Sequence, residues 1–319
     1  MSFDRPDADF VRQLALRALS SNRAPGMHFP GYFLRFQCQR YVTDGVAFTV
    51  EPGPHCASAE GIVNRGALLF SADMTLAAAN RVFLDPNLRT ATLMLRVEFT
   101  GEPARGTLEA SGLGSGFSPR TALPESVCSG RVECEGREVM RMSGTWVSPP
   151  APKGMNVRGL PWEGGEDGAT LPLLKKNQLE AGEKDVLRRI EKAMRVAQNN
   201  DLLAALWNPV VKRTPNGARG RLAVGMHVGN RVGHVQGGLL MHAALATAEA
   251  AVPDHPIVTG ASAWYISPGQ GKVVSARSII LQSGRNIAVV RTELYSDGRK
   301  LALEVVSNHA VAARAQEAA

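Results

Sequence analysis

The chain has 319 residues, of which 44% are hydrophobic and 20% charged, and it carries a net charge of +7. This length predicts about two domains, or one domain of two similar halves, and the composition excludes a disordered chain. No apolar run reaches ~18 residues, which excludes a membrane span, and the scattered basic residues without interleaved aromatics argue against nucleic acid as a partner.

The first half reads as a helix, a strand region, a long buried helix and four strands. An amphipathic helix is predicted over residues 8–20, extended structure over 32–52, and an Ala- and Leu-rich helix over 65–83. Alternating or β-branched runs bounded by turn residues then predict strands at 90–101, 105–115, 125–136 and 137–148. The acidic start lacks the features of a signal peptide, and the four cysteines show no metal-ligand spacing, so a cytoplasmic protein with free thiols is expected.

The second half repeats this order after a break. Residues 148–172 are rich in Pro and Gly without periodicity and read as a linker between units at 1–147 and 173–319. Helices are predicted at 183–198 and 237–252 and strands at 218–229, 257–268, 272–284, 286–298 and 300–312. The repeat predicts an α+β fold in which each unit wraps a curved antiparallel sheet around a buried helix.

A glycine pair, Gly237 and Gly238, opens the second buried helix. Glycines there permit close packing, and the free N–H groups of a helix N-terminus also suit a site where negative charge develops, as in acyl transfer. Both interpretations stand at this point.

The stretch "NRVGHVQGG", the helix after it and the strand pattern "SPGQGKVVSARSIILQSGRNIAVV" resemble the hotdog-fold acyl-CoA thioesterases of the phenylacetic-acid-degradation and 4-hydroxybenzoyl-CoA thioesterase-like superfamily. The resemblance covers residues 218–313 well and 30–147 more loosely, so the chain is similar to a tandem, or double, hotdog protein. It implies a thioester hydrolase without cofactor or metal ion. The basic surface also suits an anionic substrate such as acyl-CoA, and a homo-oligomer stays open.

The resemblance assigns the family's site residues unequally to the two halves. Asn230 matches the family's Asn, Gln236 stands where His is usual, and Gly237 takes the oxyanion-hole position, but the acidic position is Leu245. In the first half Asn64 stands in the position of that His, and the acidic position is kept as Asp73. The two degenerate halves therefore predict one complete site, Asp73 with Gln236 and Gly237, and one dead site. Five further residues are candidate substrate contacts: Asn64, Ser71, Thr75, His234 and Gly238.

Asp73 is expected to act as a general base or as a nucleophile on an acyl-CoA thioester, and the sequence does not choose between the two. Two other functions stay open. A hotdog enoyl-CoA hydratase or dehydratase would need a His and an acid at a spacing that is absent here, and a non-catalytic acyl-CoA or lipid-binding protein would fit the loss of the His. No group of residues has the spacing of a metal site.

Overall fold

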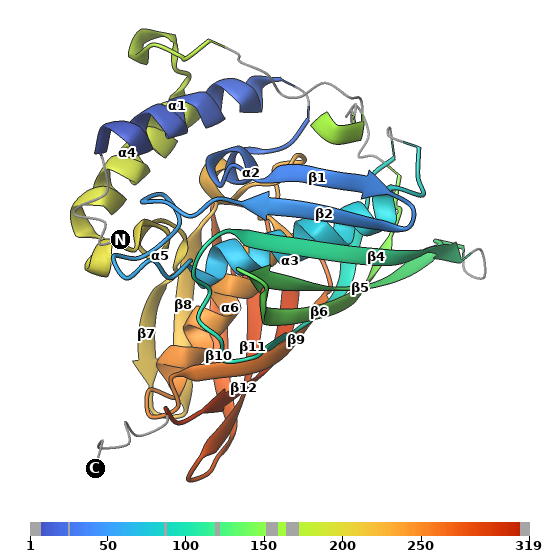
Figure 1. The fold of residues 1–319 in the computed structure, drawn as a ribbon. Coiled ribbons are helices and arrows are strands. Elements are labelled where there is room, and N and C mark those ends of the chain that lie inside the picture. The colour runs from blue at the N-terminus through green and yellow to red at the C-terminus, as the bar shows by residue number, and fades with distance from the viewer. Residues whose placement is uncertain are drawn as a thin grey trace.

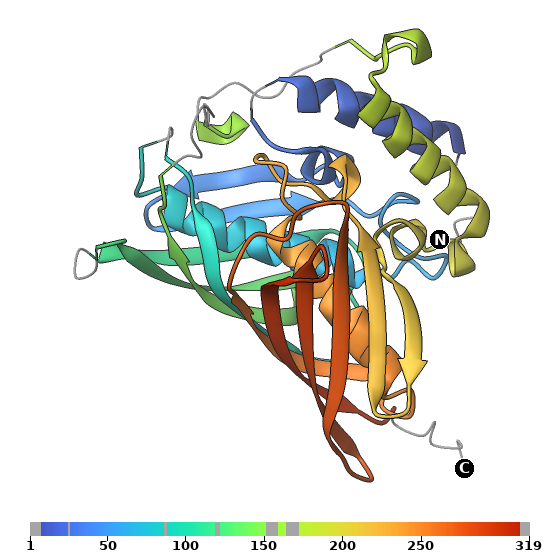
Figure 2. The same ribbon diagram turned by 180° about the vertical axis from the view of Figure 1, so that it is seen from behind.

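Two long helices packed side by side lie at the centre of the fold, wrapped by one continuous sheet (Figures 1 and 2). The computed structural model describes residues 8–24, 26–85, 88–118, 122–150, 159–163 and 172–312. The central helices are α3 (Arg65–Arg81) and α6 (Gly237–Ala251), both buried along almost their whole length. This confirms the predicted α+β class with one buried helix in each of two hotdog units.

The sheet contains twelve strands in the described part of the chain, six from each unit. The first unit contributes β1 (Gln37–Val42), β2 (Gly45–Val50), β3 (Ala91–Phe99), β4 (Leu108–Ser118), β5 (Glu125–Cys134) and β6 (Arg137–Val147). The second contributes β7 (Val210–Thr214), β8 (Gly217–Ala223), β9 (Ile257–Tyr265), β10 (Val273–Ser283), β11 (Ile287–Ser296) and β12 (Lys300–Ala310). Their order, β1-β2-β4-β5-β6-β3-β9-β12-β11-β10-β8-β7, reads alike from both ends. The units are therefore related by a pseudo-twofold axis between β3 and β9.

The two units join along the antiparallel pair β3–β9. Leu95 lies opposite Ala263 and Val97 opposite Ala261, and all four side chains are buried. Arg96, between them in sequence, points to the exposed face, as the twofold alternation of a strand requires. This alternation fixes the register of the joint, because a slip by one residue would bring Arg96 inside.

Each central helix begins at a polar residue that caps it. The Asn64 side chain accepts a hydrogen bond from the Gly66 N–H at 2.7 Å, and the Gln236 side chain accepts one from Leu239 N–H at 2.9 Å. Gly238 lets the helices approach, since a Cβ there would lie 2.1 Å from the carbonyl oxygen of Leu69 on α3. Packing therefore accounts for the second glycine of the pair.

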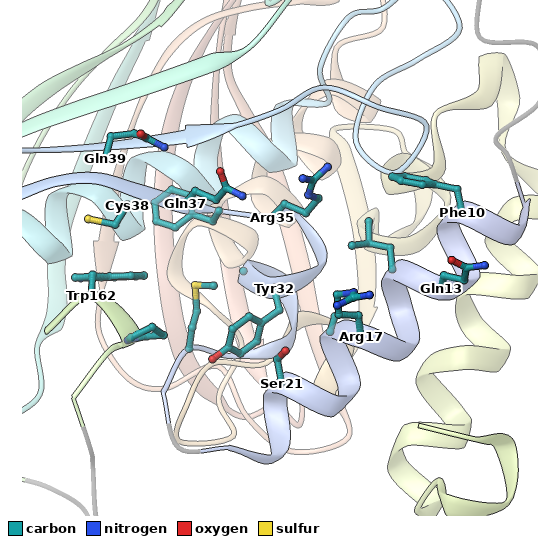
Figure 3. A pocket seen from close by; sticks show the side chains of 16 residues that line it. Phe10, Gln13, Arg17, Ser21, Tyr32, Arg35, Gln37, Cys38, Gln39 and Trp162 are labelled. Carbon is teal, nitrogen blue, oxygen red and sulfur yellow. The ribbon is translucent and has the colours of Figure 1, made fainter. Parts of the chain in front are cut away.

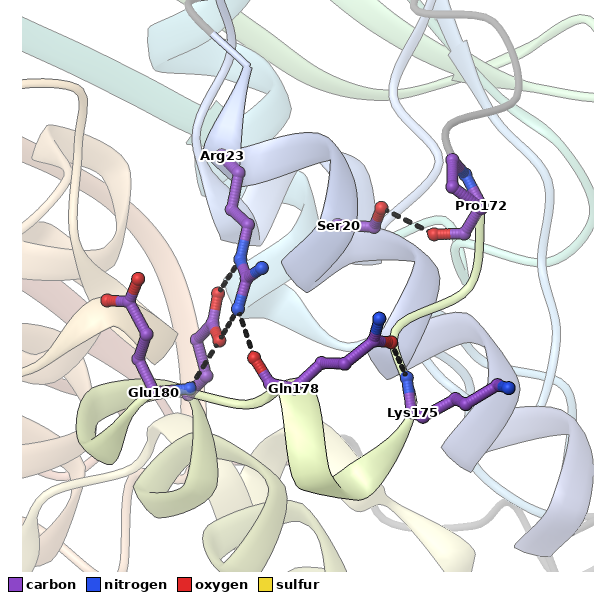
Figure 4. Close-up of polar contacts among 7 residues, drawn as sticks. Ser20, Arg23, Pro172, Lys175, Gln178 and Glu180 are labelled. Atoms are coloured by element: carbon purple, nitrogen blue, oxygen red, sulfur yellow. Dashed lines mark hydrogen bonds and ion pairs between the residues drawn. The ribbon is translucent and has the colours of Figure 1, made fainter.

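Four further helices lie outside the sheet. They are α1 (Ala8–Arg23), α2 (Phe29–Phe33), α4 (Ala181–Val196) and α5 (Leu202–Trp207). The connections contain the short 3-10 helices η1 (Pro161–Glu163), η2 (Lys176–Gln178), η3 (Gln198–Asn200) and η4 (Met226–Val228). Helices α1 and α4 pack together, one from each unit. Arg23 donates to the buried Glu183 carboxylate at 2.6 Å and to the Gln178 carbonyl at 2.7 Å (Figure 4). These contacts fasten the second unit to the first away from the sheet.

The structure corrects the sequence analysis at the start of each unit. The extended segment predicted over 32–52 is wrong at its beginning, because residues 29–33 form α2 and the hairpin β1–β2 begins only at Gln37. Helix α5 and strand β7 were missed in the second unit. Of the predicted linker, residues 151–158 and 164–171 lie outside the described residues. The segment between them is held to the first unit, since Glu163 pairs with buried Arg81 at 2.7 Å.

In the residues that the structure describes, no helix is long and apolar enough to cross a membrane.

Candidate functional site

A cavity of about 410 Å³ lies where the N-terminus of α6 meets the middle of α3. Both units line it. The first contributes Asp73 together with the start of β3 and the end of β6, and the second contributes residues 230–232 and 234–237 and the segment that follows β9. Asp73 is the only carboxylate among the lining residues of this cavity that the structure describes. The cavity therefore presents one acidic group to any ligand.

Asp73 receives hydrogen bonds from both units. Thr92 on β3 donates its hydroxyl to Oδ1 at 2.9 Å, and Gln236 donates its side-chain Nε2–H to Oδ2 at 2.7 Å. The predicted meeting of Asp73 with Gln236 across the two units is thus present in the geometry. Thr92 was missed, because its only sequence signal is a hydroxyl at the start of a strand.

Burial changes the acidity of Asp73. The carboxylate is 6% exposed, and burial raises its pKa to about 6, although hydrogen bonds from Thr92 and from the Gly238 backbone amide partly oppose this. Desolvation disfavours the charged form, whereas donated hydrogen bonds favour it. The result is a carboxylate that is mostly ionised at neutral pH and basic enough to accept a proton.

Gln236 has both ends of its side-chain amide occupied. Its Oε1 caps α6 through Leu239, so its Nε2 is directed at Asp73. The next residue, Gly237, lies so close to Asp73 that a Cβ would come within 2.7 Å of Oδ2. In the described part of the chain no group accepts a hydrogen bond from the Gly237 N–H. This N–H is a free donor in the first turn of a buried helix, beside a carboxylate.

Tyr265, at the end of β9, fixes the peptide that follows Gly237. Its hydroxyl donates to the Gly237 carbonyl oxygen at 2.9 Å, and burial, with Asp73 nearby, raises its pKa well above the usual value. Sequence reasoning missed this residue, since a tyrosine at a strand end carries no positional signal. It stays protonated and holds the start of α6 in place.

Asn230 and His234 lie in the loop that forms one wall of the cavity. The Asn230 side-chain oxygen accepts hydrogen bonds from the backbone N–H groups of Val232 and His234, each at 3.0 Å. The predicted role of Asn230 in orienting water or thioester would therefore have to use its amide nitrogen. His234 is half-buried and lines the cavity, and burial lowers its pKa.

Four predicted substrate contacts do not line the cavity. Asn64 lies at the N-terminus of α3, in the second position between the two units, which the sequence predicts to be a dead site. There its Nδ2 donates to Asp201. Ser71 and Thr75 are fully buried on other faces of α3, and Thr75 packs against Gly112 of β4. Gly238 faces α3 through its Cα. Helical geometry explains this correction, because residues two positions from Asp73 point away from it.

The reciprocal position, which is the predicted dead site between the N-terminus of α3 and the middle of α6, is filled by side chains. Arg65 forms an ion pair with both carboxylate oxygens of Glu249, and Leu245, at the position that corresponds to Asp73, is fully buried. A Cβ at Gly66 would lie 3.0 Å from the Trp207 ring and 3.5 Å from His242. Trp207 of α5 therefore occupies the space that corresponds to the cavity beside Asp73.

Two further features of the cavity carried no sequence signal. His28, the residue before α2, lines it, as do three arginines, Arg81, Arg89 and Arg231. Burial and the charge of Arg81 lower the pKa of Arg231 to about 10. Three arginines therefore line the same cavity as its single described carboxylate.

A second cavity of about 790 Å³ lies between α1, α2 and β1, away from Asp73. Its described lining includes Arg17, Arg35, Tyr32 and Trp162 but no carboxylate and no histidine (Figure 3). It therefore offers cations and apolar surface but no base. Across the described residues, no cluster of three or more His, Cys, Asp or Glu side chains is arranged to hold a metal ion.

Solved structures of thioesterases share this fold. The chain is similar to a protein assigned as an oleoyl thioesterase from Lactobacillus plantarum, with a TM-score of 0.55 and 11% identity over 85% of this chain and 98% of that one. It is also similar to the 12:0-ACP thioesterase from Umbellularia californica, with a TM-score of 0.50 and 14% identity over 84% and 94%. The tesB protein of Mycobacterium avium subs paratuberculosis is similar too, with a TM-score of 0.50 and 9% identity over 86% of this chain and 96% of that one.

No protein-family model and no curated protein sequence matches the chain. At these low identities the structural likeness establishes the fold alone, which the chain shares with these thioesterase structures.

Proposed function

We propose that the protein is an acyl-CoA thioesterase with one active site between its two hotdog units. The observation that carries the proposal is the contact of buried Asp73, from the first unit, with Gln236 at the N-terminus of α6, from the second. The contact lies in a cavity that is large enough for the reacting part of an acyl thioester. The thioesterase structures that share the fold support the same reaction class.

The reaction needs a base, a water molecule and a donor for the oxyanion. Asp73 takes a proton from water, and the resulting hydroxide adds to the thioester carbonyl carbon. The carbonyl oxygen gains negative charge opposite the free Gly237 N–H, where the α6 dipole favours it. The tetrahedral intermediate then expels the thiolate, which takes up the proton from Asp73. The products are a free acid and coenzyme A.

We favour the general base over the nucleophile for Asp73. Both carboxylate oxygens already accept hydrogen bonds, from Thr92 and Gln236, and a pKa of about 6 suits proton transfer at neutral pH. A single turnover in ¹⁸O-labelled water with rapid quenching tests this choice. A base puts the label in the product acid and forms no acyl-enzyme, whereas a nucleophile forms a mixed anhydride with Asp73, and its hydrolysis at the Asp73 carbonyl carbon leaves the label in the protein.

Arginines in the lining of the cavity support an anionic carrier for the acyl group. Arg81, Arg89 and Arg231 line the cavity together with Asp73, and Arg81 is paired with Glu163. An acyl-CoA and the matching N-acetylcysteamine thioester present the same acyl group with and without phosphates. We expect a lower KM for the CoA ester than for the N-acetylcysteamine ester. The difference between the two KM values should become smaller as salt is added, because salt screens the phosphate–arginine attraction.

The first experiment measures free-thiol release from short, long, branched and aromatic acyl-CoA esters by the wild type, Asp73→Ala and the control Glu249→Gln. Glu249 lies at the filled reciprocal position. We expect turnover by the wild type and the control, and none by Asp73→Ala. Saturable binding without turnover on any ester would instead assign the chain to the acyl-CoA-binding class, and water addition to an enoyl-CoA would assign it to the hydratases.

A further inference from the structure

His28 is a buried side chain with no bonding partner. It is 5% exposed, it lines the cavity that contains Asp73, and neither ring nitrogen has a hydrogen-bond partner among the described residues. Leaving a buried polar group unsatisfied costs ~1–3 kcal/mol. His28 therefore weakens the fold where it stands, and a phenylalanine of similar shape would not.

Helix capping does not explain His28. It precedes α2 as the N-cap residue, but its side chain makes no cap hydrogen bond. Burial, with Arg231 nearby, lowers its pKa to about 3, so the ring is neutral at physiological pH. A neutral imidazole carries one N–H donor and one acceptor. It can donate a hydrogen bond, but it does not act as a general acid at neutral pH.

The pseudo-twofold axis places His28 beside the N-terminus of α6. Its counterpart is Asp201, the N-cap of α5, which accepts from the Ala204 N–H and also from Asn64, the cap of α3 in the other unit. The same relation relates His28 to Gln236, the cap of α6, and both residues line the cavity. The ring contact of His28 with Phe70 on α3, at 5.5 Å between centroids, agrees with this position.

The two positions between the units thus differ in whether the residue that caps the short helix has hydrogen-bond partners. At the filled position Asp201 satisfies both its own helix and the opposite cap. At the open position the corresponding His28 satisfies neither and faces the cavity. A ligand group that enters the cavity can supply the missing partner.

We propose that His28 is a second oxyanion donor, whose ring N–H hydrogen-bonds the thioester carbonyl oxygen together with the Gly237 N–H. This inference rests on the proposed thioesterase function. His28 keeps its proton throughout: the proton of water goes to Asp73 and then to the leaving thiolate, while the carbonyl oxygen gains charge and loses it again as the C–S bond breaks. Neutral histidines serve as electrophiles in this manner in other enzymes.

The test compares His28→Phe, which keeps the ring shape against Phe70 but has no donor, with His28→Gln, which restores an N–H. We expect His28→Phe to lower kcat ~10²–10³-fold, the usual effect of losing one oxyanion donor. We expect its Tm to stay equal or rise, because an unsatisfied buried group is removed. His28→Gln should recover ~10-fold or more of the lost kcat, and the acid limb of the pH profile should stay at the pKa of Asp73 in both variants.

His55 supplies the matched control. It is also buried with both ring nitrogens unpartnered, and it packs against Phe10 and Phe33, but it does not line this cavity. His55→Phe should keep kcat within about twofold of the wild type.

Three results would overturn the inference. The first is a His28→Phe kcat within about threefold of the wild type, and the second is a loss of activity that comes with a lower Tm and is not recovered in His28→Gln. The third is an acid limb that disappears, since His28 would then transfer protons. If the wild type itself releases no thiol, the proposed function fails and the inference fails with it. Activity that is lost in Asp73→Ala but kept in His28→Phe refutes the inference alone.

Discussion

Gln236 donates a hydrogen bond from its side-chain Nε2 to Oδ2 of Asp73 over 2.7 Å, across the boundary between the two hotdog units. The same amide caps α6 through its oxygen. The start of one unit's central helix and the carboxylate of the other unit are therefore positioned by a single side chain.

Thr92 should set the pH dependence of the reaction. Thr92→Val keeps the shape but removes the donor to Oδ1 of Asp73, so the ionised carboxylate loses a stabilising bond and its pKa rises above about 6. We expect the acid limb of kcat/KM to move up by about one unit, since a hydrogen bond to a charged group is worth that much. The profile is measured from about pH 5 to about pH 9. Thr92→Ser should leave the limb in place, and an unmoved limb in Thr92→Val would refute the assignment to Asp73.

The two glycines at the start of α6 should fail in different ways. A methyl group at Gly237 would press on the Asp73 carboxylate, whereas one at Gly238 would meet the backbone of Leu69. We expect Gly237→Ala to lose ~10²-fold or more in kcat with a small change in Tm. Gly238→Ala should lower Tm by several degrees, because two helix backbones must separate. Parallel kinetics and thermal unfolding test this, and equal effects in both variants would contradict the division of roles.

The ion pair between Arg81 and Glu163 should carry much of the stability of the segment between the units. Both side chains are 3% exposed. Glu163→Ala leaves a buried guanidinium without its carboxylate, and we expect a loss of ~3–5 kcal/mol in the free energy of unfolding by urea. The exposed pair of Arg96 and Glu98 is the control, because Glu98→Ala should cost only ~0–1 kcal/mol. Similar losses in the two variants would show that the buried pair does not anchor the segment.

The protein should lose stability in acid. Burial lowers the pKa of His28 and His242 to about 3, and that of His55, His227 and His309 to about 4. Their pKa in the unfolded chain is about 6.5, so protons bind the unfolded state first and stability falls as the pH drops below that value. Asp73 acts in the opposite direction, since its pKa is raised to about 6, but it is one group against these five histidines.

Urea midpoints between about pH 7.5 and about pH 4.5 measure this dependence. His28→Phe should flatten part of the slope, because one of the buried titrating groups is gone. A midpoint that rises on acidification in the wild type would contradict the prediction.

The sequence by itself determined the repeat and the order of the long helices and of most strands, because apolar periodicity and turn residues are local signals. The resemblance to hotdog thioesterases, rather than periodicity, implied Asp73, Gln236 and Gly237 as the residues of one site. The sequence also placed the two long helices to within two residues of their observed ends, because apolar runs that begin beside a capping residue and glycine define a helix boundary.

Only the tertiary structure decided which side chains share the cavity. Thr92, Tyr265 and His28 come from a strand start, a strand end and a short helix, and nothing in their local sequence distinguishes them from packing residues. The same limit explains why Ser71 and Thr75 were expected near the substrate although they face elsewhere. Which positions meet across the unit boundary depends on the sheet register and on how closely the two central helices approach, and both are properties of packing that no single segment encodes.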